Sequence, residues 1–370
     1  METQKLPRDP EAGLGWLHAD GPNADIVLST RIRLARNLHG HRFGVRADAA
    51  DREAVLRLTR EAAAATESLR AGPALLIPRL GATDRQLLVE RHLVSRELVG
   101  GSGGGPATDA ALLMGDDGPV SIMVNEEDHL RLQSILGGFR LRDAWRVIDR
   151  LDDELGSKLP YAFHPEFGYL TSCPTNVGTG LRASVLMHLP GLVLTQEINK
   201  VLQGIAQVGL TFRGLYGEGS EVVGNFFQIS NQTTLGKSEE DLIDHLQRIV
   251  QQVVQYETSA RGVLLRDAPV VIEDKVWRAY GLLRHARSAS FEEVMNLLSG
   301  VRLGVGLKLI PGLSVYSLNR IMIFSQAAHL EQAAESALPD GDADVRRAAY
   351  VRRALAEGAA RPPEHGDLTD

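Results

Sequence analysis

The 370-residue chain contains a single cysteine, Cys173, which excludes a disulfide framework and a cysteine-based structural zinc site. No segment approaches the roughly 20 consecutive apolar residues that a membrane-spanning helix needs. Residues 1–16 carry charges of both signs and lack the apolar centre of a signal peptide. These absences predict a soluble, cytoplasmic protein that does not associate with membranes.

An excess of positive charge is also missing. The chain has 40 basic and 47 acidic residues and a net charge of −7, whereas proteins that bind nucleic acids without sequence preference are usually basic. We therefore expect no direct nucleic-acid binding, and any bound polyanion should be small and held locally. Most basic residues are arginine, whose planar fork suits bidentate phosphate contacts, although a GC-rich genome would explain the same bias.

Hydrophobic residues make up 44% of the chain and charged residues 24%, which is typical of globular proteins. At roughly 150 residues per domain, the length predicts about two domains. Strand-like patterns mark 25–34 and 120–124, and helical periodicity marks 50–70, 84–92, 126–136 and 143–155. Between 167 and 224, short strands alternate with glycine-rich turns and one or two helices.

The pattern changes near residues 256–266. Before this point, Ser238 and Asp241 form a capping-box pattern that opens a long helix. After it, helical periodicity marks 270–287, 291–299 (with a second cap at Ser290 and Glu293), 317–336 and 343–357. Strands followed by helices indicate an α+β fold. We divide the chain into an N-terminal extension (1–24), an α+β domain (25–256), a helical C-terminal domain (257–357) and a disordered tail (358–370).

Two glycine-containing segments look like phosphate-binding loops but lack the necessary context. Residues 100–105 have no preceding strand, no lysine and no following helix, so we interpret them as a flexible surface loop. Gly236-Lys237-Ser238 ends like a P-loop, but the position five residues earlier is Asn231 rather than glycine. Neither segment predicts a P-loop enzyme.

Two polar segments in the first half of the chain could carry chemistry. In Ser29-Thr30-Arg31-Ile32-Arg33, the two arginines are two residues apart on a strand and share a face, which suggests an anion between them. A solvated edge strand is the alternative. Residues 125–131 read Asn-Glu-Glu-Asp-His-Leu-Arg, and three acids suit the first turn of a helix. Capping alone does not explain the neighbouring Asn125 and Arg131.

Two more such segments follow. Residues 172–184 read Ser-Cys-Pro-Thr-Asn-Val-Gly-Thr-Gly-Leu-Arg-Ala-Ser, a turn that is expected to end at a helix start and to offer backbone N–H groups to an anion beside Arg182. Cys173 lies in this polar turn, where the pKa of a thiol tends to fall, although a buried, inert cysteine is the usual case. Residues 212–219 form a glycine-rich loop that presents Arg213 and Glu218, or a simple surface turn.

Together, the order and spacing of these four segments resemble the catalytic domain of the phosphagen (guanidino) kinases over residues 25–256. The Cys-Pro-Thr-Asn run at 173–176 is the signature of that family. The runs Ala183-Ser184-Val185 and 228–232 (Gln-Ile-Ser-Asn-Gln) are more similar to the bacterial protein-arginine kinases of the family, and residues 257–357 resemble their helical C-terminal domain. The N-terminal helical domain of the small-substrate members has no counterpart here. The resemblance implies an antiparallel sheet flanked by helices, followed by a helical C-terminal domain.

The resemblance also implies an ATP-dependent kinase that uses Mg²⁺. Glu127 is then the candidate base for the guanidinium nitrogen and Glu218 the second carboxylate that holds it, with Glu126 and Cys173 beside them. Positive charge around the transferred phosphoryl group would come from Arg31, Arg33, Arg131, Arg182 and Arg213. His92 would lie against the nucleotide, unless it is an ordinary helix-end histidine. The other implied nucleotide contacts are Ser29, Thr30 and Ile32. The backbone from Arg182 to Leu186 (with Ala183, Ser184 and Val185) and from Arg213 to Glu218 (with Gly214, Leu215, Tyr216 and Gly217) would complete the site.

The acceptor implied by the resemblance is an arginine side chain of another protein, which could mark that protein for regulated proteolysis or control a stress-response repressor. An activator protein, protease–chaperone machinery and a homodimer are the partners implied in the same way. A phosphoarginine receptor of pattern Arg-Asp-x-x-Arg-Ala is matched by Asp344, Arg347 and Ala348, but Ala343 replaces its first arginine, and a solvated helix face is the alternative. Two other functions remain open: a kinase for a small guanidino compound, and a catalytically silent phosphoarginine-binding adaptor.

Overall fold

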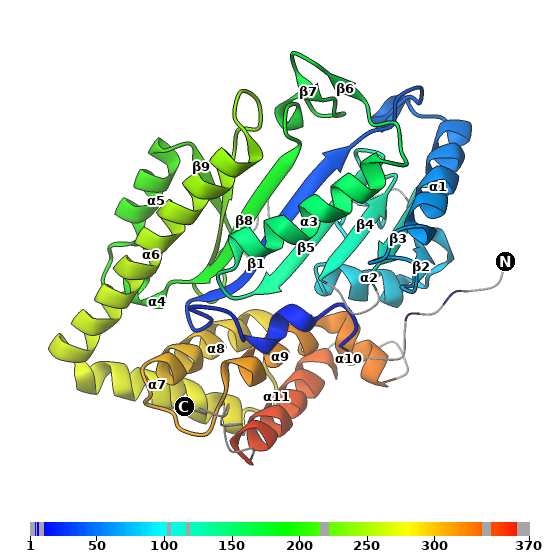
Figure 1. The fold of residues 1–370 in the computed structure, drawn as a ribbon. Coiled ribbons are helices and arrows are strands. Elements are labelled where there is room, and N and C mark those ends of the chain that lie inside the picture. The colour runs from blue at the N-terminus through cyan, green and yellow to red at the C-terminus, as the bar shows by residue number, and fades with distance from the viewer. Residues whose placement is uncertain are drawn as a thin grey trace, which may run out of the picture.

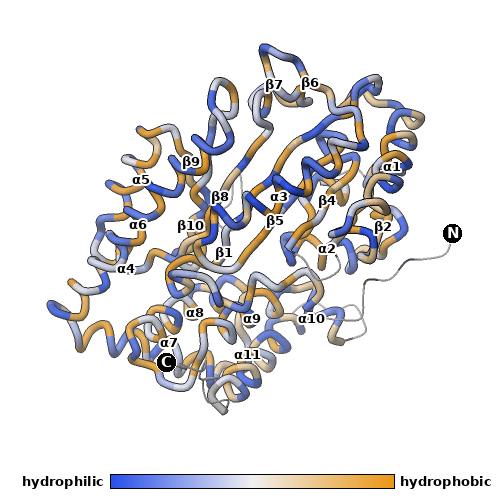
Figure 2. Tube along the Cα trace, viewed as in Figure 1, coloured by the Kyte–Doolittle hydropathy of each residue, from blue (hydrophilic) through white to orange (hydrophobic). Residues whose placement is uncertain are grey.

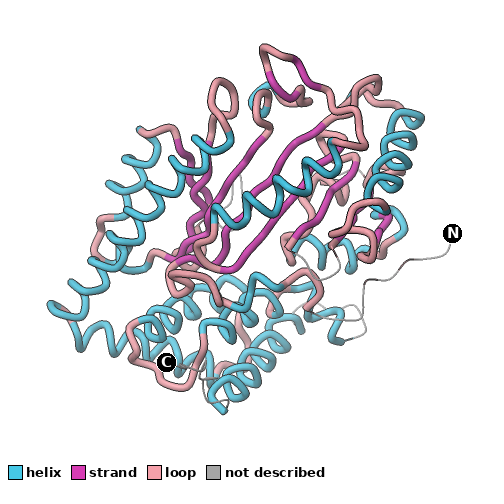
Figure 3. The backbone as a smooth tube through the Cα atoms, in the orientation of Figure 1, coloured by secondary structure: helices cyan, strands magenta, loops and turns pink. Residues whose placement is uncertain are grey.

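The computed structural model describes residues 4, 6, 11–101, 105–115, 119–214, 222–334 and 342–360. Its centre is an eight-stranded sheet in the order β2-β3-β4-β5-β1-β8-β10-β9 (Figures 1 and 3). All neighbouring strands in this sheet are antiparallel. The strands are β1 (Val27–Arg36), β2 (Ala74–Leu76), β3 (Ala111–Met114), β4 (Val120–Val124), β5 (Leu130–Gly137), β8 (Leu181–His188), β9 (Leu210–Arg213) and β10 (Phe226–Asn231). A separate hairpin is formed by β6 (Phe163–His164) and β7 (Gly168–Tyr169).

One face of this sheet is covered by helices. The side chains of Ile32 and Leu34 on β1 are fully buried in the main core, because α3 (Leu141–Gly156) packs over β1 and β5 while α6 (Glu239–Asp267) packs over β8 and β10. In Figure 2, hydrophobic and hydrophilic residues alternate along α3. Its buried residues include Leu141, Ile148 and Leu155, which are spaced at whole turns, so one stripe of the helix faces the sheet.

The remaining helices lie around the sheet and at one of its ends. The helices near the sheet are α1 (Ala49–Ala64), α2 (Ala82–Glu90), α4 (Pro190–Leu194) and α5 (Ile198–Gln207). Those at its lower end in Figure 1 are α7 (Pro269–His285), α8 (Phe291–Gly306), α9 (Val315–Phe324), α10 (Ala327–Ala334) and α11 (Asp342–Ala360). The short 3-10 helix Gly15–His18 packs against β1 and β5 on one side and α9 on the other. The expected α+β fold, with an antiparallel sheet flanked by helices and a helical C-terminal part, is confirmed.

The two helix starts expected from capping patterns are present. Ser238 and Asp241 form a reciprocal capping box at the start of α6, and the Ser290 side chain accepts a hydrogen bond from the Glu293 backbone N–H at the start of α8. Helix α6 is continuous over 29 residues, so a division at 256/257 falls inside it. None of the described helices is long and apolar enough to cross a lipid bilayer.

Two expected helices are different in the structure. Residues 126–136 are not a helix: residues 125–129 form the turn of a β-hairpin, and β5 follows. The local pattern favours a helix start, but long-range pairing of β5 with β4 and β1 decides the conformation. The segment 317–336 is also not one helix, because α9 ends at Phe324 and α10 begins at Ala327.

Candidate active site

Four arginines are brought to one face of the sheet by strand register. Arg31 and Arg33 alternate with buried residues along β1, and Arg33 lies directly opposite Arg182 of β8. On the other side of β1, Ala35 lies opposite Arg131 of β5. Because directly opposite residues in a sheet project to the same side, all four side chains emerge on the face turned away from α3.

A fifth arginine joins the same face from the edge of the sheet. Arg213 of β9 is opposite Gln228 of β10, and Gln228 is opposite Leu186 of β8. Leu186 is four residues from Arg182 on the same strand, so it shares the face of Arg182. The five arginines that the sequence analysis selected therefore come from four strands and lie on one surface, which we call the arginine face: Arg31, Arg33, Arg131, Arg182 and Arg213.

The arginine face lacks enough negative charge to balance it. Burial, followed by the charges of Arg182 and Arg131, lowers the pKa of Arg31 to about 10. Burial and the charges of Arg31, Arg131 and Arg182 also lower the pKa of Arg33 well below its usual range, against the opposing charge of Glu126. Among the described residues, no carboxylate lies within ion-pair distance of Arg31 or Arg33. An anion bound between these guanidinium groups would restore the balance.

Arg131 connects the arginine face to two glutamates. Its Nη1 lies 2.8 Å from Glu126 Oε1, and its Nη2 lies 3.3 Å from Glu127 Oε2. The Glu126 side chain is 1% exposed, whereas that of Glu127 is 44% exposed. Although burial raises the pKa of Glu126, Arg131 and a hydrogen bond from Ser95 bring it below the ordinary glutamate value. Burial together with Asp128 and Glu126 raises the pKa of Glu127, against Arg131. The exposed carboxylate is thus the more basic of the two.

The turn that presents Glu127 is held by its neighbours. Asn125 has a left-handed backbone (φ 57°), and its amide donates to the carbonyls of Arg52 and Asp109. The Asp128 carboxylate accepts from the Asn37 amide and from the Ser172 backbone N–H, both at 2.7 Å. These bonds fix the position of the hairpin turn before any ligand is present.

Cys173 lies beside this turn. The preceding residue, Ser172, donates its hydroxyl to the Glu127 carbonyl at 2.7 Å. The Cys173 Sγ is 3.0 Å from Thr175 Oγ1, and the side chain is partly exposed. The segment that carries the thiol is therefore bonded to the main chain of the more basic glutamate.

His92 closes one end of the arginine face. Together with Arg31 and Gln228 it lines a small cavity of about 20 Å³, whose other lining residues are Ser29, Ile135, Ser184 and Leu186. Its main-chain carbonyl accepts from Gln133 Nε2 at 2.9 Å, and its ring meets that of Trp16 edge-on. Burial, with a smaller effect of Arg31, lowers the pKa of His92 to about 3, so the ring is neutral.

The side chains of several residues in the predicted nucleotide site do not face this surface. Thr30 is fully buried on the opposite face, where its hydroxyl donates to the Gly138 carbonyl at 2.7 Å, and Ile32, Ala183 and Val185 belong to the core under the helices. Their side chains do not line the arginine face. Arg182 is also not beside a helix start, because β8 begins at Leu181. The polar turn feeds a strand, so backbone N–H groups at a helix N-terminus are not available there.

Two other groups of predicted residues stand apart. Leu215, Tyr216, Gly217 and Glu218 lie outside the described residues, as does the tail beyond residue 360, whereas Gly214 is described and buried. Asp344, Arg347 and Ala348 are on α11 in the C-terminal part, away from the arginine face. There the Arg347 guanidinium pairs with Asp344 and donates to the carbonyls of Ser325 (2.8 Å) and Ala289 (3.0 Å).

Three polar residues of the site were not selected from the sequence. Ser95 hydrogen-bonds Glu126, Gln228 lines the small cavity, and Ser230 accepts from Arg182 Nη2 at 3.3 Å. The alternation of Gln228, Ile229 and Ser230 was a usable signal, because polar residues at every second position of an apolar strand mark a polar face. Ser95 lies in a loop and gives no such signal.

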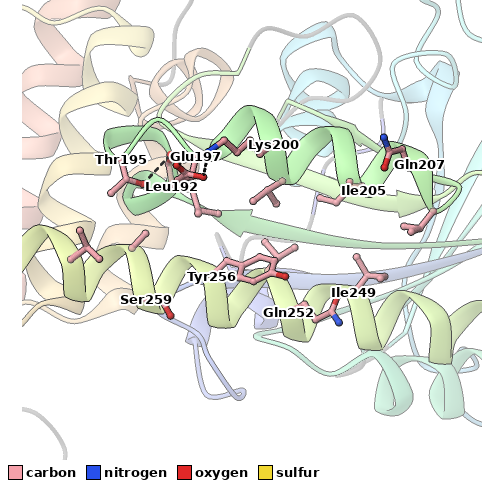
Figure 4. Close-up of a pocket in the computed structure, with 16 residues that line it drawn as sticks. Leu192, Thr195, Glu197, Lys200, Ile205, Gln207, Ile249, Gln252, Tyr256 and Ser259 are labelled. Atoms are coloured by element: carbon pink, nitrogen blue, oxygen red, sulfur yellow. Dashed lines mark hydrogen bonds and ion pairs between the residues drawn. The ribbon is translucent and has the colours of Figure 1, made fainter.

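A larger cavity of about 840 Å³ lies between α5 and α6 (Figure 4). It is lined mainly by apolar side chains such as Ile205, Ile249 and Val253, with Lys200 and Glu197 paired at one end. None of the predicted site residues lines it. Size alone therefore does not identify the candidate active site.

Comparison with family models matches both parts of the chain. Residues 55–260 match the C-terminal catalytic domain of the ATP:guanido phosphotransferases, and residues 269–365 match the C-terminal domain of the protein-arginine kinase McsB. The residues between the two matched ranges, 261–268, form the end of α6 and its connection to α7.

Whole proteins with similar sequences agree with these matches. The chain is 45% identical to the protein-arginine kinase of Brevibacillus brevis over 96% of this chain and 98% of that protein. It is 47% identical to that of Moorella thermoacetica (92% and 97%) and 44% identical to that of Bacillus subtilis (92% and 93%).

Solved structures give the same fold. The duplicated taurocyamine kinase of Schistosoma mansoni, with bound components of a transition-state analogue, superposes with a TM-score of 0.59 at 26% identity, covering 65% of this chain and 34% of that one. A lombricine kinase superposes with a TM-score of 0.58 at 24% identity, covering 70% and 72%.

Proposed function

Because the chain belongs to the ATP:guanido phosphotransferase family, and is therefore a phosphotransferase of the kinase class, we propose that it transfers the γ-phosphoryl group of ATP to arginine side chains of proteins. The observation that carries the proposal is the arginine face: five arginines lie on one face of the sheet, Arg131 of this set contacts Glu127, and Arg31 and Arg33 have no ion-pair partner among the described residues. The relatives that share both parts of the chain are named protein-arginine kinases.

ATP enters this proposal as the phosphate donor on the arginine face. Phosphoryl transfer requires negative charge to be neutralised and the donor held in line with the attacking nitrogen. Arg31, Arg33 and Arg182 lie on adjacent strands, and their planar guanidinium groups can bind phosphate oxygens through two hydrogen bonds each. His92 and Gln228, at the small cavity, would meet the rest of the nucleotide. Mg²⁺ would arrive with the phosphates as part of the substrate and neutralise part of their charge.

Glu127 is the proposed base. A guanidinium ion has a pKa above about 12 and is a poor nucleophile until a proton leaves. A partly exposed carboxylate with a raised pKa, beside an arginine that also faces the phosphates, can orient that nitrogen and accept its proton. Glu126 stays ionised because it pairs with Arg131, and this ion pair orients the Arg131 guanidinium group. Glu218 would hold the other side of the guanidinium group, and Cys173 would lie beside the reacting atoms.

The proposed acceptor is an arginine in a protein rather than free arginine. The Glu127 side chain is 44% exposed, so it is accessible to an arginine carried by a large substrate. A protein substrate brings contacts of its own, and these can supply the positioning that makes transfer fast. Marking proteins for regulated proteolysis, control of a repressor, an activator protein, a homodimer and phosphoarginine sensing at Asp344 and Arg347 remain proposals by resemblance.

The test is to incubate the protein with MgATP and either an unfolded protein or free arginine. Mass spectrometry under non-acidic conditions, which preserve the N–P bond, should find phosphoarginine in the protein. Free arginine should be at least about tenfold worse in kcat/KM, a difference of ~1.4 kcal/mol. Equal turnover of both acceptors would favour the small-guanidino kinase. Binding of nucleotide and phosphoarginine without turnover would favour the silent adaptor.

A further inference from the structure

A buried carboxylate joins α2 of the sheet-containing part to α10 of the C-terminal part. Glu90, the last residue of α2, accepts hydrogen bonds from the backbone N–H groups of Ala328 (3.0 Å) and His329 (3.3 Å) in the first turn of α10. A carboxylate at this place satisfies donors that have no partner within the helix. The segment before α10 is held from the opposite side, where Arg347 donates to the Ser325 carbonyl.

The same carboxylate belongs to a chain of three buried side chains. His329 Nδ1 lies 2.8 Å from Glu90 Oε2, and Arg91 Nε donates to His329 Nε2 at 3.4 Å. Burial lowers the pKa of His329, although Glu90 opposes this shift. A neutral ring with its proton on Nδ1 satisfies both contacts, since it donates to the carboxylate and accepts from the guanidinium group. All three side chains are at most 5% exposed.

The next residue along the sequence, His92, lines the small cavity on the arginine face. We call this the nucleotide cavity, because the proposed function gives it to the nucleotide. His92 follows Arg91 directly and has a left-handed backbone (φ 60°), because its N–H and that of Leu93 close the end of α2 on the carbonyls of Val89 (2.9 Å) and Leu88 (3.0 Å). On one side, the helix end is fixed by Glu90 and Arg91. On the other, the His92 carbonyl accepts from Gln133, which lies opposite Arg33 in the sheet. The main chain of His92 is thus held by the end of α2, where Glu90 bonds the C-terminal part, and by the bond from Gln133 of β5.

We propose that Glu90 is a positioning residue for nucleotide binding. Together with His329 it holds His92 at the nucleotide cavity, so the affinity for ATP depends on the contact between α2 and α10. The proposal rests on the proposed function, because it takes that cavity as the nucleotide site. Without the bonds from Glu90 to α10, His92 would be correctly placed in only a fraction of the molecules. The apparent affinity for nucleotide would fall in proportion to that fraction.

A second buried glutamate provides a matched control. Glu257 accepts from the backbone N–H groups of Gly191 (2.9 Å) and Leu192 (3.0 Å) in the first turn of α4, and it pairs with Arg261 at 2.7 Å. It therefore makes the same kinds of bond as Glu90. Neither it nor its partners line the nucleotide cavity.

The experiment measures ADP and ATP affinity by calorimetry, and melting temperature, in the full-length Glu90→Gln, His329→Leu, His329→Asn and Glu257→Gln variants. We expect Glu90→Gln and His329→Leu to raise the Kd for nucleotide about threefold to tenfold, with kcat at saturating ATP changed less than about twofold. Asparagine can keep the donor to Glu90, so His329→Asn should recover part of the affinity. Glu257→Gln should lower the melting temperature but keep the wild-type Kd.

Wild-type affinity in both Glu90→Gln and His329→Leu, with only the melting temperature lowered, would overturn the proposal. If Glu90→Gln does not fold, His329→Leu decides the question alone. Failure of the proposed function is distinguishable, because a wild-type protein that binds nucleotide but forms no phosphoarginine still allows the comparison of affinities. A wild-type protein that binds no nucleotide would reject both.

Discussion

The hydroxyl of Ser172 donates a 2.7 Å hydrogen bond to the main-chain carbonyl of Glu127. This single bond joins the turn that carries the proposed base to the segment that carries Cys173. Asp128 strengthens the connection by accepting from the Ser172 backbone N–H. The segments that carry Glu127 and Cys173 are therefore bonded to each other, although the two residues are 46 positions apart in the sequence.

Replacing the proposed base should separate chemistry from binding. Glu127→Gln keeps the size and hydrogen-bonding capacity of the side chain but cannot accept the proton, so turnover should fall by roughly 10²–10⁴-fold. The Kd for ADP should remain close to the wild-type value. Single-turnover formation of phosphoarginine and calorimetric binding of ADP measure the two quantities. Near-normal turnover in this variant would remove Glu127 from the role.

The pH dependence of turnover should report the raised pKa of Glu127. The base is inactive when protonated, so kcat should fall as the pH drops through that pKa. The midpoint of this fall, the acid limb of the pH profile, should lie at a higher pH than the pKa of an ordinary glutamate. Glu126→Gln removes a nearby negative charge and frees Arg131 to face Glu127. Both changes lower the pKa of Glu127, so the limb should move to lower pH. A limb that moves upward or stays in place would contradict this assignment.

The planar fork of Arg31 should matter beyond its charge. Arg31→Lys keeps a positive charge but loses bidentate contacts, and a lost charge-assisted hydrogen bond of about 1.5–3 kcal/mol corresponds to roughly 10- to 100-fold in kcat/KM. Arg57→Lys is the matched control, since Arg57 forms an exposed pair with Glu61 on α1. Equal activity of the Arg31→Lys variant and the control would show that charge alone suffices.

The single thiol permits a selective chemical probe of the site. Alkylation can occur at no other cysteine than Cys173, and bound MgATP should slow it if the thiol lies beside the phosphoryl group, as its neighbour Glu127 suggests. Cys173→Ser should keep part of the activity, because a hydroxyl can still contact Thr175. The rate of iodoacetamide labelling with and without nucleotide measures this. A labelling rate that is the same with and without nucleotide would show that the thiol does not lie beside the phosphoryl group.

The fold itself depends on one buried ion pair behind the site. Arg36 Nη2 lies 2.6 Å from Asp152, and the guanidinium carbon lies 3.5 Å from the centre of the Tyr169 ring. Asp152→Ala leaves a buried, unpaired arginine and should lower the free energy of unfolding by about 3–5 kcal/mol. Asp244→Ala removes the exposed pair with Arg142 and should cost about 0–1 kcal/mol. Chemical denaturation of both variants checks the difference, and equal losses would contradict it.

The parts of this site that follow from local sequence could be predicted. Alternation on one strand correctly placed Arg31 and Arg33 on a common face, and the spacing of Ser238 and Asp241 correctly located the start of α6. Both features are set by residues within a few positions of one another. Neither requires knowledge of which strands become neighbours.

The hairpin at Glu127 could not be predicted in this way. Three consecutive acids favour a helix start, and only pairing of β5 with two distant strands makes the segment extended. Arg182 was assigned to a helix start for the same reason, although it lies in β8 opposite Arg33. The relation of Glu90 to α10 joins residues 238 positions apart, and no local pattern contains it.

The crowding of positive charge on the arginine face also has a consequence for the empty protein. Arg31 and Arg33 repel each other and two neighbours across the sheet, so the unliganded fold carries an electrostatic load that any bound polyphosphate relieves. A ligand that binds only the folded state adds about 2.7 kcal/mol of stability at a concentration one hundred times its Kd. The melting temperature of this protein should therefore rise with the concentration of its own substrate, and this added stability should fade as the concentration falls toward the Kd.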